Sequence, residues 1–209
     1  MLHCYRGGIL ADQFKDVTKE WLKKVKINDN NYKKRSYFKK DGIKYYVNNK
    51  TVMHDHTEIE EKMALFIQKT FGGNIYMIPR VIDPNYTRTP DYQYINSKLN
   101  INDYFDLKTI QSNDINIVDN KIKKSWRQSE NFILDFGKSN LTNDEIILQI
   151  QKLYDNKMRR WVNIIIIKKH NFIRIFRRQK RAMLASPKWK RCLTTTCNIR
   201  YFIKYVNIL

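Results

Sequence analysis

Helical and strand-like patterns alternate along most of the chain, and their order limits the folds open to it. The ranges expected to be helical are 11–25, 54–73, 112–129 and 141–156. The ranges expected to form strands are 43–49, 74–81, 91–95, 104–110 and 131–136, with a β-hairpin over 160–178. Helices placed between strands build layers around one sheet. The predicted fold class is therefore α/β (α+β), with a mixed central β-sheet flanked by helices.

Two of the expected helices have clear N-terminal signals. Thr57 or Asp55 can cap the helix within 54–73, and a Gly-Gly pair stops it. Thr142 or Asn143 can cap the helix that follows.

The charge of the chain bears on its partners. There are 40 Lys and Arg residues against 20 Asp and Glu, a net charge of +20, and no acidic residue follows Asp155. Such an excess favours nucleic acid as the partner. An anionic membrane surface, an acidic protein, and solubility alone are the alternatives.

The cysteines and the apolar runs exclude several classes of protein. The three cysteines, Cys4, Cys192 and Cys197, are too few and too uneven for a disulfide framework, and a zinc site at the last two is a weak alternative. No apolar run approaches the ~20 residues of a membrane span. The first residues lack the continuous apolar region of a signal peptide. We therefore expect the chain to act in the cytoplasm, with any export address elsewhere.

A cluster of two carboxylates and a lysine is expected on neighbouring strands. Asp106 and Lys108 lie two residues apart on one strand and so share a face, whereas Leu107 points the other way. Asp91, at the start of the preceding strand, can lie beside Asp106. Adjacent carboxylates repel unless a cation bridges them, and hard divalent ions prefer such oxygen ligands. With a carboxylate from the helix over 54–73, these groups can cleave a phosphodiester.

The alternative interpretation of the same residues is a solvated strand face. An Asp followed two residues later by a Lys is common, so this pair alone is weak. Pro90-Asp91 at the right separation and the basic C-terminal region strengthen the catalytic interpretation.

The motifs in this region resemble a known family. "TPDY" and "FDLK" resemble the Pro-Asp…(Asp/Glu)-x-Lys signature of the PD-(D/E)XK nuclease superfamily. In order, "FGG", "TPDY", "FDLK" and "QSENFILD" are similar to the C-terminal tRNA nuclease domain of contact-dependent growth inhibition toxins. Similar domains end some phage minor head proteins and other mobile-element proteins. The resemblance covers roughly residues 44–178 and implies a PD-(D/E)XK nuclease-like core.

The resemblance implies roles for five residues. Asp91 and Asp106 would be metal ligands, with Glu61 as the third carboxylate, and Lys108 would be the catalytic lysine. Gln128 would face the site from a later helix. The metal would be Mg²⁺ or Mn²⁺.

The roles of some neighbouring residues remain open. The helical periodicity puts Glu60 nearer the apolar stripe than Glu61, so Glu60 is the substitute for that role. His54 and His56 precede the helix and can approach a phosphate, although loop histidines are more often bystanders.

The expected partners follow from charge and resemblance together. RNA, in particular tRNA, is the expected substrate, and an acidic immunity protein is a further expected partner. The residues expected to contact nucleic acid are Lys123, Lys124, Arg127, Arg177 and Arg178. We expect residues 1–43 to be a linker or the remnant of a larger secreted or phage polypeptide, residues 44–178 to be the nuclease domain, and residues 179–209 to be a basic, aromatic extension. A DNA endonuclease of the same fold and a non-catalytic nucleic-acid-binding module are the alternative functions.

Overall fold

The computed structural model of the protein describes residues 14–24, 32–85 and 87–179. They all belong to the first of two compact units, Met1–Gln179 and Lys180–Leu209. The helices are α1 (Thr18–Lys24), α2 (Glu58–Phe71), α3 (Ile117–Lys123) and α4 (Asn143–Asp155), with short 3-10 turns η1 (Ser97–Leu99) and η2 (Lys157–Arg159). The strands are β1 (Phe14–Asp16), β2 (Lys33–Lys34), β3 (Tyr37–Lys40), β4 (Ile43–Tyr46), β5 (Val52–Met53), β6 (Asn74–Met77), β7 (Arg80–Val81), β8 (Tyr92–Asn96), β9 (Ile101–Thr109), β10 (Asn131–Asp135), β11 (Ile164–Lys169) and β12 (Phe172–Arg178).

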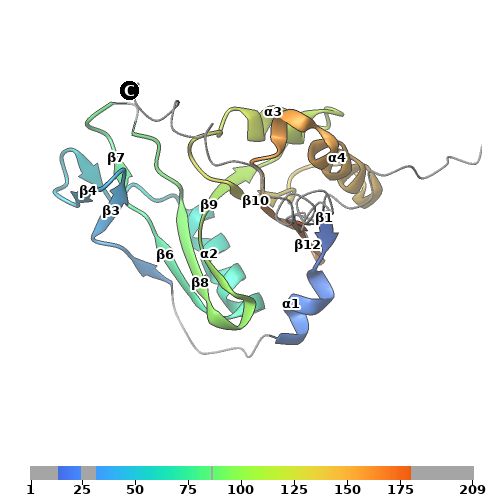
Figure 1. Cartoon of the computed structure of the whole chain (residues 1–209), viewed down its shortest axis with the longest axis horizontal. Helices are drawn as coiled ribbons and strands as arrows, with labels where there is room; N and C mark the ends of the chain where they lie inside the picture. The colour runs from blue at the N-terminus through green and yellow to red at the C-terminus, as the bar shows by residue number, and fades with distance from the viewer. Residues whose placement is uncertain (1–13, 25–31, 86, 180–209) are drawn as a thin grey trace, which may run out of the picture. The chain divides into compact units, whose positions relative to one another are not determined.

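The fold is mixed α+β, as the sequence predicts. Eight strands form the main sheet in the order β1-β12-β11-β10-β9-β8-β6-β2 (Figure 1). β9, β10 and β11 are parallel neighbours, whereas β8 with β9 and β11 with β12 are antiparallel pairs. Two small two-stranded sheets, β3–β4 and β5–β7, lie outside it.

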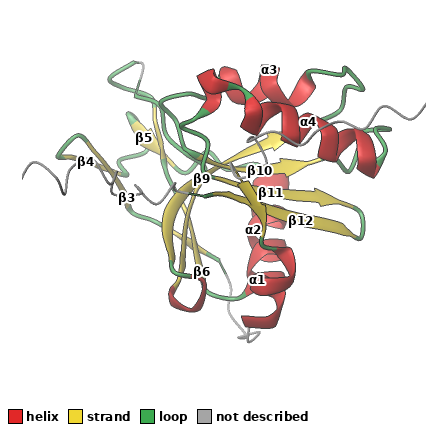
Figure 2. Cartoon of the chain, turned by 45° about the vertical axis from the view of Figure 1, so that its right-hand side comes forward, coloured by secondary structure: helices red, strands yellow, loops and turns green. Residues whose placement is uncertain are grey.

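Helices cover both faces of the central strands (Figure 2). Met63 and Ile67 of α2 share one apolar core with Leu107 and Ile133, and Trp21 of α1 belongs to the same core. The core on the opposite face joins α3 and α4 to the strands, and its members include Val118, Ile122, Phe132, Leu134, Ile146 and Ile150. β10 is therefore apolar on both faces, which is typical of a central parallel strand.

The N-terminal region differs from expectation. Phe14–Asp16 pairs with β12 as an edge strand, so the helix expected over 11–25 begins only at Thr18. Lys33–Lys34 pairs with β6. β1 and β2 are thus the edge strands of the main sheet, whereas β3 pairs with β4 outside it.

Two further expectations concern other parts of the chain. The cysteines and the residues after 179 lie outside the described residues. Within the described ranges, no helix has both the length and the apolar character needed to cross a bilayer.

Candidate active site

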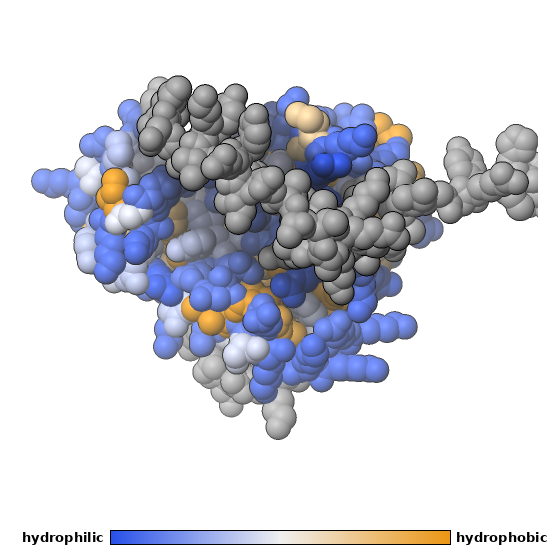
Figure 3. Space-filling view, in the orientation of Figure 1, coloured by the Kyte–Doolittle hydropathy of each residue, from blue (hydrophilic) through white to orange (hydrophobic). Residues whose placement is uncertain are grey.

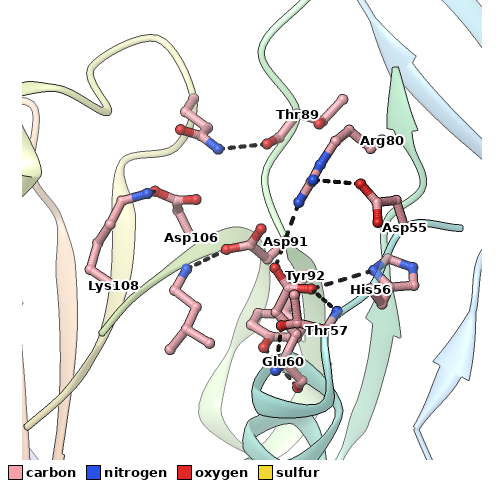
Figure 4. Close-up of polar contacts among 12 residues, drawn as sticks. Asp55, His56, Thr57, Glu60, Arg80, Thr89, Asp91, Tyr92, Asp106 and Lys108 are labelled. Atoms are coloured by element: carbon pink, nitrogen blue, oxygen red, sulfur yellow. Dashed lines mark hydrogen bonds and ion pairs between the residues drawn. The ribbon is translucent and has the colours of Figure 1, made fainter. Parts of the chain in front are cut away.

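Asp91 immediately precedes β8 and lies between β9 and the segment that follows β6. Its backbone N–H donates to the Phe105 carbonyl, and its carbonyl accepts from Ile78. Because β8 begins only at Tyr92, the Leu107 N–H has no strand partner there, and Asp91 Oδ2 accepts it at 2.6 Å. The side chain thus caps the end of a strand while it faces Asp106 (Figure 4).

Asp106 and Lys108 project together from β9, as expected. Asp106 is fully buried, and apart from Lys108 and the Asp91 carboxyl, no group among the described residues hydrogen-bonds to its carboxylate oxygens. The Lys108 ammonium forms an ion pair with Asp106 Oδ2 at 2.5 Å. A buried carboxylate with so few hydrogen-bond donors is costly, so a cation in contact with it is strongly favoured.

The two aspartates perturb each other. Burial raises the pKa of Asp91 well above its usual range, and the negative charge of Asp106 raises it further. The hydrogen bond from the Leu107 N–H lowers the pKa of Asp91, but it does not offset the effects of burial and of Asp106. Perturbed carboxylates of this kind are enriched at functional sites.

The two candidate glutamates of α2, Glu60 and Glu61, have different surroundings. Glu61 forms an ion pair with Lys34 at 2.9 Å, and the hydrogen bond from Lys34 lowers its pKa. Glu60 completes a capping box with Thr57, and its charge contributes to the raised pKa of Asp91. The structure therefore brings Glu60, rather than Glu61, toward the aspartates.

Arginine and histidine residues surround Glu60. Arg80 pairs with Asp55 at 2.7 Å and reaches Glu60 at 3.8 Å. His56 Nδ1 lies 4.0 Å from Glu60 Oε2, and burial lowers the pKa of His56 to about 4. His56 is thus neutral at pH 7. His54 packs against it with ring centroids 5.6 Å apart, but its side chain is exposed.

A turn after α3 is tied to the segment that carries Asp91. The Gln128 amide donates to the Thr89 carbonyl at 2.7 Å, and Arg88 donates to the carbonyls of Lys124 and Trp126. Gln128 therefore lies at the site as a group that holds Thr89 in place. Sequence reasoning missed Arg88 and Arg80, because no local periodicity signals contacts between residues so far apart in the chain.

The basic residues expected to contact nucleic acid have different environments. Lys123 and Lys124 are exposed at the end of α3, and the Arg127 guanidinium lies 4.3 Å from the Trp126 ring centroid. Arg177, on β12, is partly exposed. Arg178, by contrast, donates to the carbonyls of Val162 and Arg159 and stacks on Tyr154. Arg178 is therefore engaged in internal contacts.

The donor set fits a divalent cation in part. Among the described residues, no three His, Cys, Asp or Glu side chains lie close enough together to hold a metal ion. Two carboxylates do meet, however, and a cation would relieve both the missing hydrogen bonds of Asp106 and the raised pKa of Asp91. Asp91 and Asp106 therefore fit a cation in part, and Glu60 is the α2 carboxylate whose charge acts on Asp91.

Comparisons with known proteins point to one family. A search of curated proteins found no match to this sequence. Among solved structures, a CdiA-CT/CdiI toxin and immunity complex from Burkholderia pseudomallei aligns at a TM-score of 0.40 and 19% identity, over 59% of this chain and 91% of that chain. So distant a likeness carries no argument on its own. The family model described as the contact-dependent growth inhibition CdiA C-terminal domain matches residues 88–173, a range that includes Asp91, Asp106, Lys108 and Gln128. This segment of the chain is thus similar to the CdiA C-terminal domain family of contact-dependent growth inhibition.

Proposed function

We propose that the protein is a metal-dependent endonuclease that cleaves phosphodiester bonds of RNA, with tRNA as its substrate and a PD-(D/E)XK-like site. One observation carries the proposal: the buried Asp106 carboxylate lies beside Asp91 and pairs with the Lys108 ammonium. The similarity of residues 88–173 to a growth-inhibition toxin domain family supports a toxic activity of this kind.

Each residue of the site has a definite part in this proposal. Asp91 and Asp106 would hold Mg²⁺ or Mn²⁺, with Glu60 as the further carboxylate, and the ion would polarise the phosphate and activate a water. Lys108 would bind a phosphate oxygen and stabilise the charge that develops on it. Gln128 is a positioning residue, because it holds the carbonyl of Thr89 two residues before Asp91.

The charge of the chain favours RNA delivery to this site and an acidic neutralising partner. A net charge of +20 speeds encounters with polyanions, including an immunity protein with an acidic surface. Figure 3 shows that the described surface on one face is predominantly hydrophilic. We place the activity in the cytoplasm of a target cell.

The test compares three substrates under identical conditions. Purified protein is incubated with tRNA, total RNA and plasmid DNA in Mg²⁺, in Mn²⁺ and in EDTA. We expect metal-dependent cleavage of tRNA and no cleavage in EDTA. Cleavage of the plasmid alone would make the protein a DNA nuclease, and salt-dependent binding without any cleavage would make it a non-catalytic module.

A further inference from the structure

A cavity of about 520 Å³ is linked through Gln128 to the segment that carries Asp91, and the proposed chemistry makes no use of the cavity. It is located where β9 extends past the start of β10 at Asn131. Gln128 forms part of its wall, and the same amide holds Thr89, two residues before Asp91. A group bound in this cavity would therefore belong to the same substrate as the bond being cleaved.

Three aromatic side chains line the cavity: Tyr104, Trp126 and Trp161. Trp126 is 50% exposed, although it is a large apolar residue, and the Arg127 guanidinium covers its ring. Arg127 also adopts a positive φ of 75°, which is uncommon for a residue other than glycine. Exposed tryptophans with an adjacent guanidinium are typical platforms for stacking nucleobases.

Two carboxylates line the same cavity. The Asp103 and Glu130 side chains form no hydrogen bond or ion pair within the part of the chain that the structure describes, although the protein has two basic residues for every acidic one. Unpaired carboxylates repel a phosphate, but they accept hydrogen bonds from N–H groups. With these two carboxylates against the single guanidinium of Arg127 in its lining, the cavity suits the base of a nucleotide better than its phosphate.

We propose that this cavity, which we call the base cavity, binds one unstacked nucleobase of the RNA and prefers guanine. Guanine carries two adjacent N–H donors on its Watson–Crick edge, so a single carboxylate can accept two parallel hydrogen bonds from it. Adenine, cytosine and uracil lack this pair of donors. The inference rests on the proposed RNA nuclease function, because it assigns that enzyme a preference at or near the cleaved bond.

The test measures binding and needs no cleavage. Fluorescent single-stranded pentanucleotides UUGUU, UUAUU, UUCUU and UUUUU are titrated with the full chain in EDTA, and anisotropy is followed. The backbone charge is the same in all of them, so differences report the central base. We expect UUGUU to bind about tenfold more tightly than the others, which is the discrimination that one good bidentate contact supplies.

Variants separate base recognition from general electrostatics. Asp103→Asn together with Glu130→Gln makes the protein more positive, so electrostatics alone predicts tighter binding to every oligonucleotide. The base cavity predicts the opposite for UUGUU, a loss of about tenfold and of the guanine preference. Asp155→Asn, an exposed change of charge on α4, is the control.

The stacking wall is tested in the same assay. Trp126→Ala should weaken UUGUU binding about tenfold, and Trp126→Phe should restore most of it. Leu148→Ala, which removes another exposed apolar side chain, should leave binding unchanged. Equal affinity for the four oligonucleotides, or full affinity in Trp126→Ala, would overturn the proposal. A guanine preference in a protein that cleaves no RNA would refute the nuclease function and not the base cavity.

Discussion

The Asp91 carboxylate serves the backbone and the site at once. It caps the free Leu107 N–H, and it is crowded by Asp106 so that its charged form is disfavoured. In Asp91→Asn the amide oxygen can still accept from Leu107, while the repulsion is removed. We expect the metal-free protein to unfold at equal or higher urea concentration, with a gain of up to about 1 kcal/mol at neutral pH.

Asp91→Asn should also lose the stabilisation that a bound metal ion gives to the parent protein. Mn²⁺ should raise the urea midpoint of the parent protein by mass action and leave that of Asp91→Asn nearly unchanged. An equal shift in both proteins would show that the cation binds elsewhere.

His56 makes stability depend on pH. Its folded-state pKa is about 4, whereas the unfolded imidazole takes up a proton near its ordinary value of about 6.5. Its contribution is therefore complete above about pH 6.5 and is lost as the pH falls toward 4. Between pH 7 and 5 the parent should lose about 1–2 kcal/mol more than His56→Gln, with allowance for solvent screening. Urea unfolding of both proteins at the two pH values measures this difference, and parallel losses would contradict it.

The roles of Glu60 and Glu61 can be distinguished by replacing each of them with glutamine. Glutamine can replace glutamate in a capping box, so Glu60→Gln should keep the start of α2 intact. We expect it to lower RNA cleavage at least about 30-fold if Glu60 is the further carboxylate. Glu61→Gln removes an ion pair with an exposed lysine and should cost activity less than about threefold. The reverse order of the two effects would restore Glu61 to the role implied by the family resemblance.

Among the elements, the connection from α2 to β6 fixes the helix against the sheet. Gly73 has a φ of +81°, and an added Cβ would lie 2.7 Å from the Ile95 carbonyl oxygen. Gly42 has almost the same φ, +82°, but open space around its Cβ position. Gly42→Ala should cost about 1 kcal/mol, and Gly73→Ala about 3 kcal/mol or more, because only the latter adds a clash with the backbone. Denaturant unfolding compares the two variants. Equal losses of stability would show that the connection between α2 and β6 can shift to accommodate the added Cβ.

The sequence predicts the elements whose signals are local. The caps at Thr57 and Thr142 are confirmed as capping boxes, and the hairpin of β11 and β12 turns at His170 as expected. β4 lies within the strand expected over 43–49, but its partner β3 fell within the predicted linker, although Asp41-Gly42, both at positive φ, is a recognisable hairpin-turn signal. β1 has no such signal, because its partner β12 lies far along the chain.

The site residues, too, were predictable from the sequence where local patterns position them. Strand alternation placed Asp106 and Lys108 on one face, and strand order placed Asp91 beside them. Helical periodicity favours Glu60, which the structure brings toward the aspartates, whereas the family resemblance favours Glu61. The contacts of Arg88 with the turn after α3 depend on tertiary packing that no spacing encodes.

The whole molecule should bind RNA with a strong dependence on salt. Each phosphate that a Lys or Arg neutralises adds about 0.7 to the slope of log K against log salt for single strands. Lys123→Ala with Lys124→Ala should lower that slope by about 1. Arg178→Ala should lower stability instead, because its guanidinium is bound to carbonyls within the fold. Anisotropy titrations over a range of salt test the first statement, and urea unfolding tests the second. An unchanged slope in the double lysine variant would remove the end of α3 from the RNA surface.

The most direct test is single-turnover tRNA cleavage in Mg²⁺ by Asp106→Asn and by Lys108→Met, with Asp155→Asn as the control for altered charge. Urea unfolding first establishes that each variant is folded. Removing either partner of this ion pair should slow cleavage at least about 100-fold and leave tRNA binding in EDTA within a few-fold of the parent. Cleavage at the parent rate by both folded variants would contradict the assignment of hydrolysis to Asp91, Asp106 and Lys108.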